Sequence, residues 1–84
     1  MKNYLMVYND TLGNRTFVCN ILNRIPCDWR YDIDNCYYLK SDLTADELTK
    51  SILKYARGRF FITEITANRQ GILPKRTWEF LRQK

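Results

Sequence analysis

The order in which strand-like and helix-like segments follow one another is the feature that most constrains the fold of this 84-residue chain. Four segments are short, rich in aromatic and β-branched residues, and separated by turn residues, which predicts strands. They are residues 4–8, 27–31, 36–40 and 59–66. Helical patterns lie between the first and second of these strands and between the third and fourth.

Each predicted helix has its own start and stop signals. Apolar residues recur at helical spacing from Phe17 to Ile25, after the candidate N-cap Asn14, and Pro26 ends the pattern. The second predicted helix opens on a capping box at residues 44–47 and continues to Gly58. Pro74 fits the first turn of a short final helix.

This order predicts an α+β fold, specifically a ferredoxin-like β-α-β-β-α-β sandwich with a short C-terminal helix. Residues 1–84 are expected to form a single ferredoxin-like domain, with 71–84 as a tail segment that carries the short helix. A chain of this size buries only roughly 60–65% of its unfolded surface. Any active site is therefore expected to be shallow or shared between subunits.

One face of such a sheet has no helix from the two β-α-β units, yet both faces of the predicted strands carry apolar side chains. An uncovered apolar face usually marks an interface. It can be covered by the tail helix folding back, by a second copy in a symmetric homodimer, or by stacked bases. The residues assigned to this interface are Tyr4, Met6, Tyr8, Tyr38, Phe60 and Trp78.

Charge is divided unequally along the chain. Residues 1–49 hold five basic and seven acidic residues, whereas residues 50–84 hold nine basic and two acidic ones. A one-sided basic half favours RNA or DNA as a partner, and the alternatives are a solvated basic surface or an acidic protein partner. The residues predicted to contact nucleic acid are Arg57, Arg59, Arg69, Lys75 and Arg76.

Cysteine and histidine usage excludes several kinds of site. The chain has three cysteines in no CxxC pair and no histidine, which argues against structural zinc, a disulfide framework and Ser–His or Cys–His nucleophiles. No apolar run is long enough to span a bilayer and no leader-like segment opens the chain, so a cytoplasmic protein with no membrane partner is expected. Hydrolytic chemistry would need a carboxylate and a metal ion.

The carboxylate considered for that role is Asp10, directly after the first predicted strand. Together with acidic residues around the 32–35 turn it could hold Mg²⁺ and activate water against a phosphate. The alternative is turn chemistry, for which Asp and Asn are the usual residues. Asp10 is accordingly the candidate catalytic and metal-binding residue, and no cofactor is expected if the chain is not catalytic.

Several segments together resemble a known family. They are residues 4–8, the strand centred on Trp29, residues 43–48, and the closing run GILPKRTWEFL at 71–81. In these segments, which extend over nearly the whole chain, the sequence resembles the SinR-like proteins. These are small ferredoxin-fold proteins related to the CRISPR adaptation endonuclease subunit and to virulence-associated D ribonucleases.

The resemblance implies a homodimer with two packed sheets and, in the nuclease relatives, an acidic metal ligand directly after the tyrosine that ends the first strand. Asn9 occupies that position here, and Asp10 follows one residue later. We therefore expect a small basic, dimeric, nucleic-acid-associated protein whose Mg²⁺-dependent nuclease activity is weakened or lost. The alternative is a non-catalytic protein–protein interaction module, such as a phage- or mobile-element-borne inhibitor of a larger host defence complex.

Overall fold

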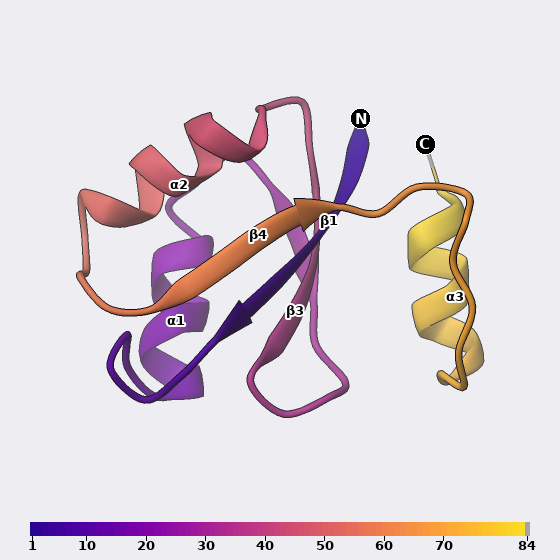
Figure 1. Cartoon of the computed structure of the whole chain (residues 1–84), viewed down its shortest axis with the longest axis horizontal. Helices are drawn as coiled ribbons and strands as arrows, with labels where there is room; N and C mark the ends of the chain where they lie inside the picture. Colours follow the sequence, from indigo (N-terminus) through magenta and orange to yellow (C-terminus); the bar gives the residue numbers. More distant parts are fainter. Residues whose placement is uncertain (84) are drawn as a thin grey trace.

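The structure, a computed structural model, describes residues 1–83 and has the predicted order of elements (Figure 1). The elements in chain order are β1 (Lys2–Tyr8), α1 (Arg15–Leu22), β2 (Asp28–Arg30), β3 (Cys36–Ser41), α2 (Ala45–Leu53), β4 (Phe60–Glu64) and α3 (Lys75–Arg82). None of the helices within residues 1–83 combines the length and the apolar character that crossing a lipid bilayer requires.

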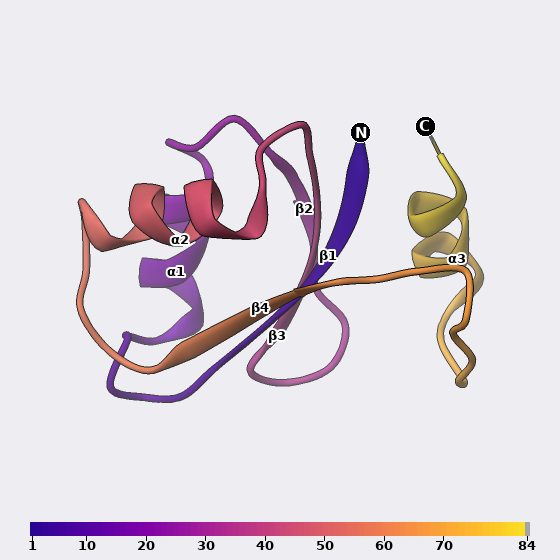
Figure 2. The same cartoon turned by 45° about the horizontal axis from the view of Figure 1, so that its top comes forward.

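The strands form one antiparallel sheet. Within the described residues the strand order is β2-β3-β1-β4, with Tyr4 of β1 opposite Leu39 of β3 and Glu64 of β4. Helices α1 and α2 lie on one side of the sheet and α3 lies on the other (Figures 1 and 2). The predicted α+β class, with an antiparallel sheet and helices, is confirmed.

The main core lies between the sheet and helices α1 and α2. Alternate residues of β1, namely Tyr4, Met6 and Tyr8, are buried there at 2%, 0% and 6% exposure. Buried tyrosine hydroxyls need partners, and the Tyr4 hydroxyl donates to the Leu43 carbonyl at 2.7 Å. Helices α1 and α2 cover these side chains with apolar residues that include Val18 and Leu48.

The prediction that Tyr4, Met6, Tyr8 and Phe60 lie on the uncovered face of the sheet is wrong. Tyr4, Met6 and Tyr8 point toward α1 and α2 rather than toward the second face, and Phe60 lies opposite Tyr8 and packs against the same core. Because side chains alternate along a strand, the second face of β1 is instead carried by Leu5 and Val7. These four residues therefore belong to the core of the single chain.

The second sheet face is covered in part by α3. The Arg30 Nε–H donates to Thr77 Oγ1 at 2.8 Å, and the Asn3 side-chain amide donates to the Leu81 carbonyl at 2.5 Å. The buried Lys40 ammonium donates to the Gln83 carbonyl and lies 5.2 Å from the centre of the Phe80 ring. The sequence leaves three ways to cover this face: the tail helix, a second copy or stacked bases. In the structure the tail helix folds back over part of it.

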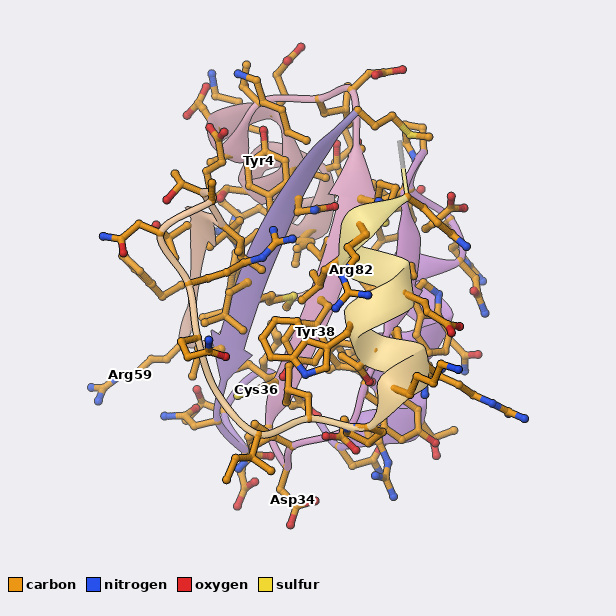
Figure 3. The ribbon with its side chains drawn as sticks, turned by 90° about the vertical axis from the view of Figure 1, so that its right-hand side faces the viewer. Tyr4, Asp34, Cys36, Tyr38, Arg59 and Arg82 are labelled. Atoms are coloured by element: carbon orange, nitrogen blue, oxygen red, sulfur yellow. The ribbon has the colours of Figure 1, made fainter. Side chains whose placement is uncertain are left out.

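Tyr38 and Trp78 are the other two predicted interface residues. Both line a cavity of about 320 Å³ between the second sheet face and the tail, together with Leu5, Cys36 and Leu73. Tyr38 is only 6% exposed and lies beside α3, as Figure 3 shows. The tail of the same chain covers Tyr38, and a role of both residues between two chains stays a prediction.

Local signals set the helix starts as predicted. Asn14 Oδ1 accepts the Phe17 N–H at 2.9 Å at the start of α1. At α2, Thr44 Oγ1 accepts the Glu47 N–H at 3.1 Å while Glu47 Oε1 accepts the Thr44 N–H at 2.9 Å. The predicted capping box is therefore confirmed, with both of its reciprocal bonds present.

The predicted end of α2 at Gly58 is wrong. The helix ends at Leu53, and Gly58 lies farther along the connection, against the backbone of the β1–α1 loop. A Cβ on Gly58 would lie 2.5 Å from backbone atoms of Thr11 and Leu12. Close approach of two backbones, rather than helix termination, requires glycine at this position.

The buried phenols and thiols predict a loss of stability at alkaline pH. Burial raises the pKa of six groups, and raises that of the Cys27 thiol from 9.0 to about 11. The six groups are Tyr4, Tyr8, Cys27, Cys36, Tyr37 and Tyr38. Above pH 9 the unfolded chain releases these protons before the folded chain does, so the free energy of unfolding is expected to fall as pH rises.

Lys40 acts in the opposite direction, because burial lowers the pKa of its ammonium and thereby increases stability with pH just below 10.5. Six groups lower the free energy of unfolding as pH rises and Lys40 alone raises it, so a net fall is expected. Chemical denaturation between pH 7.5 and 10.5 measures it, and Cys27→Ala should flatten the part of the curve above pH 9. An unfolding free energy that does not change over this range would contradict the prediction.

Candidate nucleic-acid interface

The basic residues predicted to bind phosphates do not form one cluster. Arg57 and Arg59 lie in the connection to β4, at one edge of the sheet, whereas Lys75 and Arg76 begin α3 and Arg76 lies beside β2, at the other edge. Figure 3 shows the Arg59 side chain extending away from the body of the protein. The loop backbone is fixed, since the Arg59 N–H donates to Thr11 Oγ1 at 2.9 Å.

Two of the predicted cations have partners within the chain. The Arg69 guanidinium donates to the Leu81 carbonyl at 3.5 Å and is half-buried, so it holds the tail to α3. Lys75 lies 3.9 Å from the Glu79 carboxylate, one helical turn away. The Arg69 contact is long, and the Lys75–Glu79 pair is exposed to solvent. Both contacts therefore orient these side chains more than they stabilise the fold.

A larger feature lies along the edge of the sheet formed by β2. We call it the β2–α3 hollow: a cavity of about 540 Å³ between the edge strand and the tail helix. Its walls are Trp29, Arg30 and Tyr31 on one side and Arg76, Glu79, Phe80 and Gln83 on the other. Three aromatic residues and two arginines therefore line it, and no further strand of residues 1–83 pairs with this edge.

The side chains of Trp29 and Tyr31 contact each other and residues of α1 and its C-terminal end. The Trp29 indole N–H donates to Asn23 Oδ1 at 2.9 Å, and the Tyr31 ring lies nearly parallel to the Trp29 ring, with 14° between the planes. The Arg15 guanidinium carbon lies 4.6 Å from the centre of the Tyr31 ring. Arg15 thus occupies one face of the Tyr31 ring in a cation–π contact, and Tyr31 is still 42% exposed.

Of the seven residues lining the hollow, only Arg76 is among those assigned to nucleic acid from the sequence. Two patterns could have indicated the others. The run Trp29-Arg30-Tyr31 alternates aromatic and basic residues, and Arg76, Glu79, Phe80 and Gln83 are spaced i, i+3, i+4 and i+7, which places them on one face of α3. The residues of these two patterns line one hollow because α3 docks beside β2, and neither pattern predicts that docking.

The position of the candidate catalytic residue, Asp10, is settled by the end of β1. The strand ends at Tyr8, so Asn9 and Asp10 belong to the turn that follows. Asn9 Oδ1 accepts both the Thr11 N–H at 2.9 Å and the Thr11 hydroxyl at 2.5 Å. The oxygen at the position of the expected metal ligand is thus occupied by turn hydrogen bonds.

Asp10 does face a second acid across a shallow cavity of about 280 Å³, since Asp34 from the β2–β3 turn lines the same space. Arg15 lines it too, so a cation lies beside the two carboxylates. Within residues 1–83, no three Asp, Glu, Cys or His residues come together as a metal site. The donors of one chain therefore do not fit the Mg²⁺ site that the resemblance implies.

Neither family models, nor curated proteins, nor solved structures give a match to this chain.

Proposed function

We propose that the protein binds single-stranded RNA or DNA at the β2–α3 hollow and does not cleave it. The observation that carries the proposal is that Arg30 and Arg76 line one open space together with the aromatic residues Trp29, Tyr31 and Phe80. Arginines bind phosphates bidentately, and aromatic rings stack on unpaired bases. A hollow rather than a flat surface suits a strand whose bases are exposed.

The fold supports this proposal at the level of architecture. The element order β-α-β-β-α-β, the strand order β2-β3-β1-β4 and the placement of α1 and α2 on one face are features of a ferredoxin-like sandwich. The same fold is what the resemblance to the SinR-like proteins implies. We therefore infer a ferredoxin-like domain that keeps nucleic-acid affinity in the absence of a complete metal site.

The proposal is tested by removing one ring and one charge from the hollow. Tyr31→Ala/Arg76→Ala is expected to weaken binding of a fluorescent single-stranded oligonucleotide by about 30-fold, because a stacked base and a phosphate contact are lost. The matched control is Lys54→Ala/Tyr55→Ala, which removes one tyrosine ring and one positive charge directly after α2, where Tyr55 is 43% exposed. Binding by the control should stay within about twofold of wild type.

The same assay measures salt dependence and cleavage. Affinity should fall as salt rises, because bound phosphates release counterions, and no products should form with Mg²⁺ or with EDTA. Equal losses in the two double variants would contradict the site, and an absence of binding to every RNA and DNA would contradict the function. Mg²⁺-dependent products that disappear in Asp10→Ala would contradict binding without cleavage.

A second candidate function, docking on another protein, is favoured by one observation. Phe61 is 66% exposed and neighbours Val7, which is 39% exposed, on the part of the second sheet face that α3 leaves uncovered. Exposed apolar side chains next to each other suit a protein partner, either a second copy or a larger complex. Failure of all nucleic-acid binding, with the fold intact, would favour this candidate.

A further inference from the structure

The face of α3 that lines the hollow contains a residue that a phosphate site does not need. Glu79 lies between Arg76 and Phe80, and its side chain is 51% exposed. A carboxylate repels phosphate, so it weakens a site that has only backbone phosphates to bind. Among the described residues that line the hollow, Glu79 is the one carboxylate.

We infer that Glu79 reads the base held in the hollow and favours guanine. An ionised carboxylate is a pure acceptor with two oxygens side by side. Guanine alone among the common bases offers two adjacent donors, N1–H and the N2 amino group, on its Watson–Crick edge. Adenine and cytosine place a ring acceptor beside their amino group, and uracil flanks its one N–H with two carbonyls.

The surroundings of Glu79 suit this role. Phe80 supplies a ring next to it on the same helix face, while Arg30 and Arg76 supply charges for the flanking phosphates. The Lys75 ammonium lies 3.9 Å from Glu79 Oε1 and leaves the carboxylate accessible, since the Glu79 side chain is 51% exposed. Unpaired bases in single strands expose this edge, so it can be read directly. The inference rests on the proposed nucleic-acid function and specifies the base that the site prefers.

The test compares oligouridylates that carry one central guanosine, inosine, adenosine or cytidine, by fluorescence anisotropy. Guanosine should bind about tenfold more tightly than the unsubstituted strand, as expected for a bidentate contact to one base. Inosine, which lacks the N2 amino group, should lose most of that gain. Glu79→Gln should remove the guanosine preference, so that the guanosine strand and the unsubstituted strand bind this variant equally.

Glu64→Gln is the matched control, because it removes one exposed carboxylate on β4 and should retain the preference. Equal binding of all four strands would overturn the inference while the proposed function stands. A guanosine preference that survives in Glu79→Gln would overturn it as well. Failure of every strand to bind would overturn the proposed function and, with it, the inference.

Discussion

Leu39→Ala is expected to lower the free energy of unfolding by about 3 kcal/mol, a large share of the stability of a domain this small. Leu39 is fully buried on β3, between Tyr4 of β1 and Trp29 of β2 in the sheet register. Removing three carbons there leaves a cavity that two strands and the helices above them cannot close without moving together.

The control is Leu53→Ala, the same change at the end of α2, where the side chain is 39% exposed. Its expected cost is below about 1 kcal/mol, because little apolar surface returns to water. Urea denaturation of both variants at neutral pH measures the difference. Equal losses at the two positions would mean that Leu39 does not face the core, and the register given for β3 would have to be abandoned.

Gly58→Ala is expected to cost about 2 kcal/mol, although it adds only one methyl group. The added carbon would lie 2.5 Å from the Leu12 backbone, and backbone atoms cannot move aside as a flexible side chain can. The loop contacts next to it, including the Arg59 N–H bond to Thr11 Oγ1, would be strained by the shift.

Gly71→Ala provides the comparison, since an added Cβ at Gly71 meets nothing within 4 Å. It should leave stability unchanged or raise it slightly by restricting the unfolded chain. Thermal unfolding of the two alanine variants separates a close backbone approach from a general intolerance of glycine replacement. A Gly58→Ala protein as stable as Gly71→Ala would contradict the contact with the β1–α1 loop.

The parts of the fold that local chemistry determines were predictable. The Asn14 cap, the Thr44 capping box and the order of strands and helices follow from neighbouring residues. The face to which β1 turns its tyrosines was not predictable, because Leu5 and Val7 are apolar as well and alternation gives no preference. Only the packing of α1 and α2 against Tyr4 and Met6 decides it.

The candidate site was predictable only in part, for a related reason. Arg76 was identified by its charge, but Arg30 and Tyr31 gain their place beside it through the docking of α3 on a strand far earlier in the chain. Charge counts say how many cations a segment has and nothing about which of them converge. The division of Arg59 and Arg76 between opposite edges of the sheet likewise depends on strand order, which is a property of the whole fold.

The hydrogen bonds that hold α3 on the sheet affect how the protein folds during its synthesis. The bond from Asn3 to the Leu81 carbonyl joins residues 78 positions apart, so it cannot form until Leu81 has been synthesised and α3 has docked. A nascent polypeptide with β4 already outside the ribosome has a complete sheet whose second side is bare. During that interval Leu5, Cys36 and Tyr38 face water, and chaperones or neighbouring nascent chains can reach a surface that the finished protein hides.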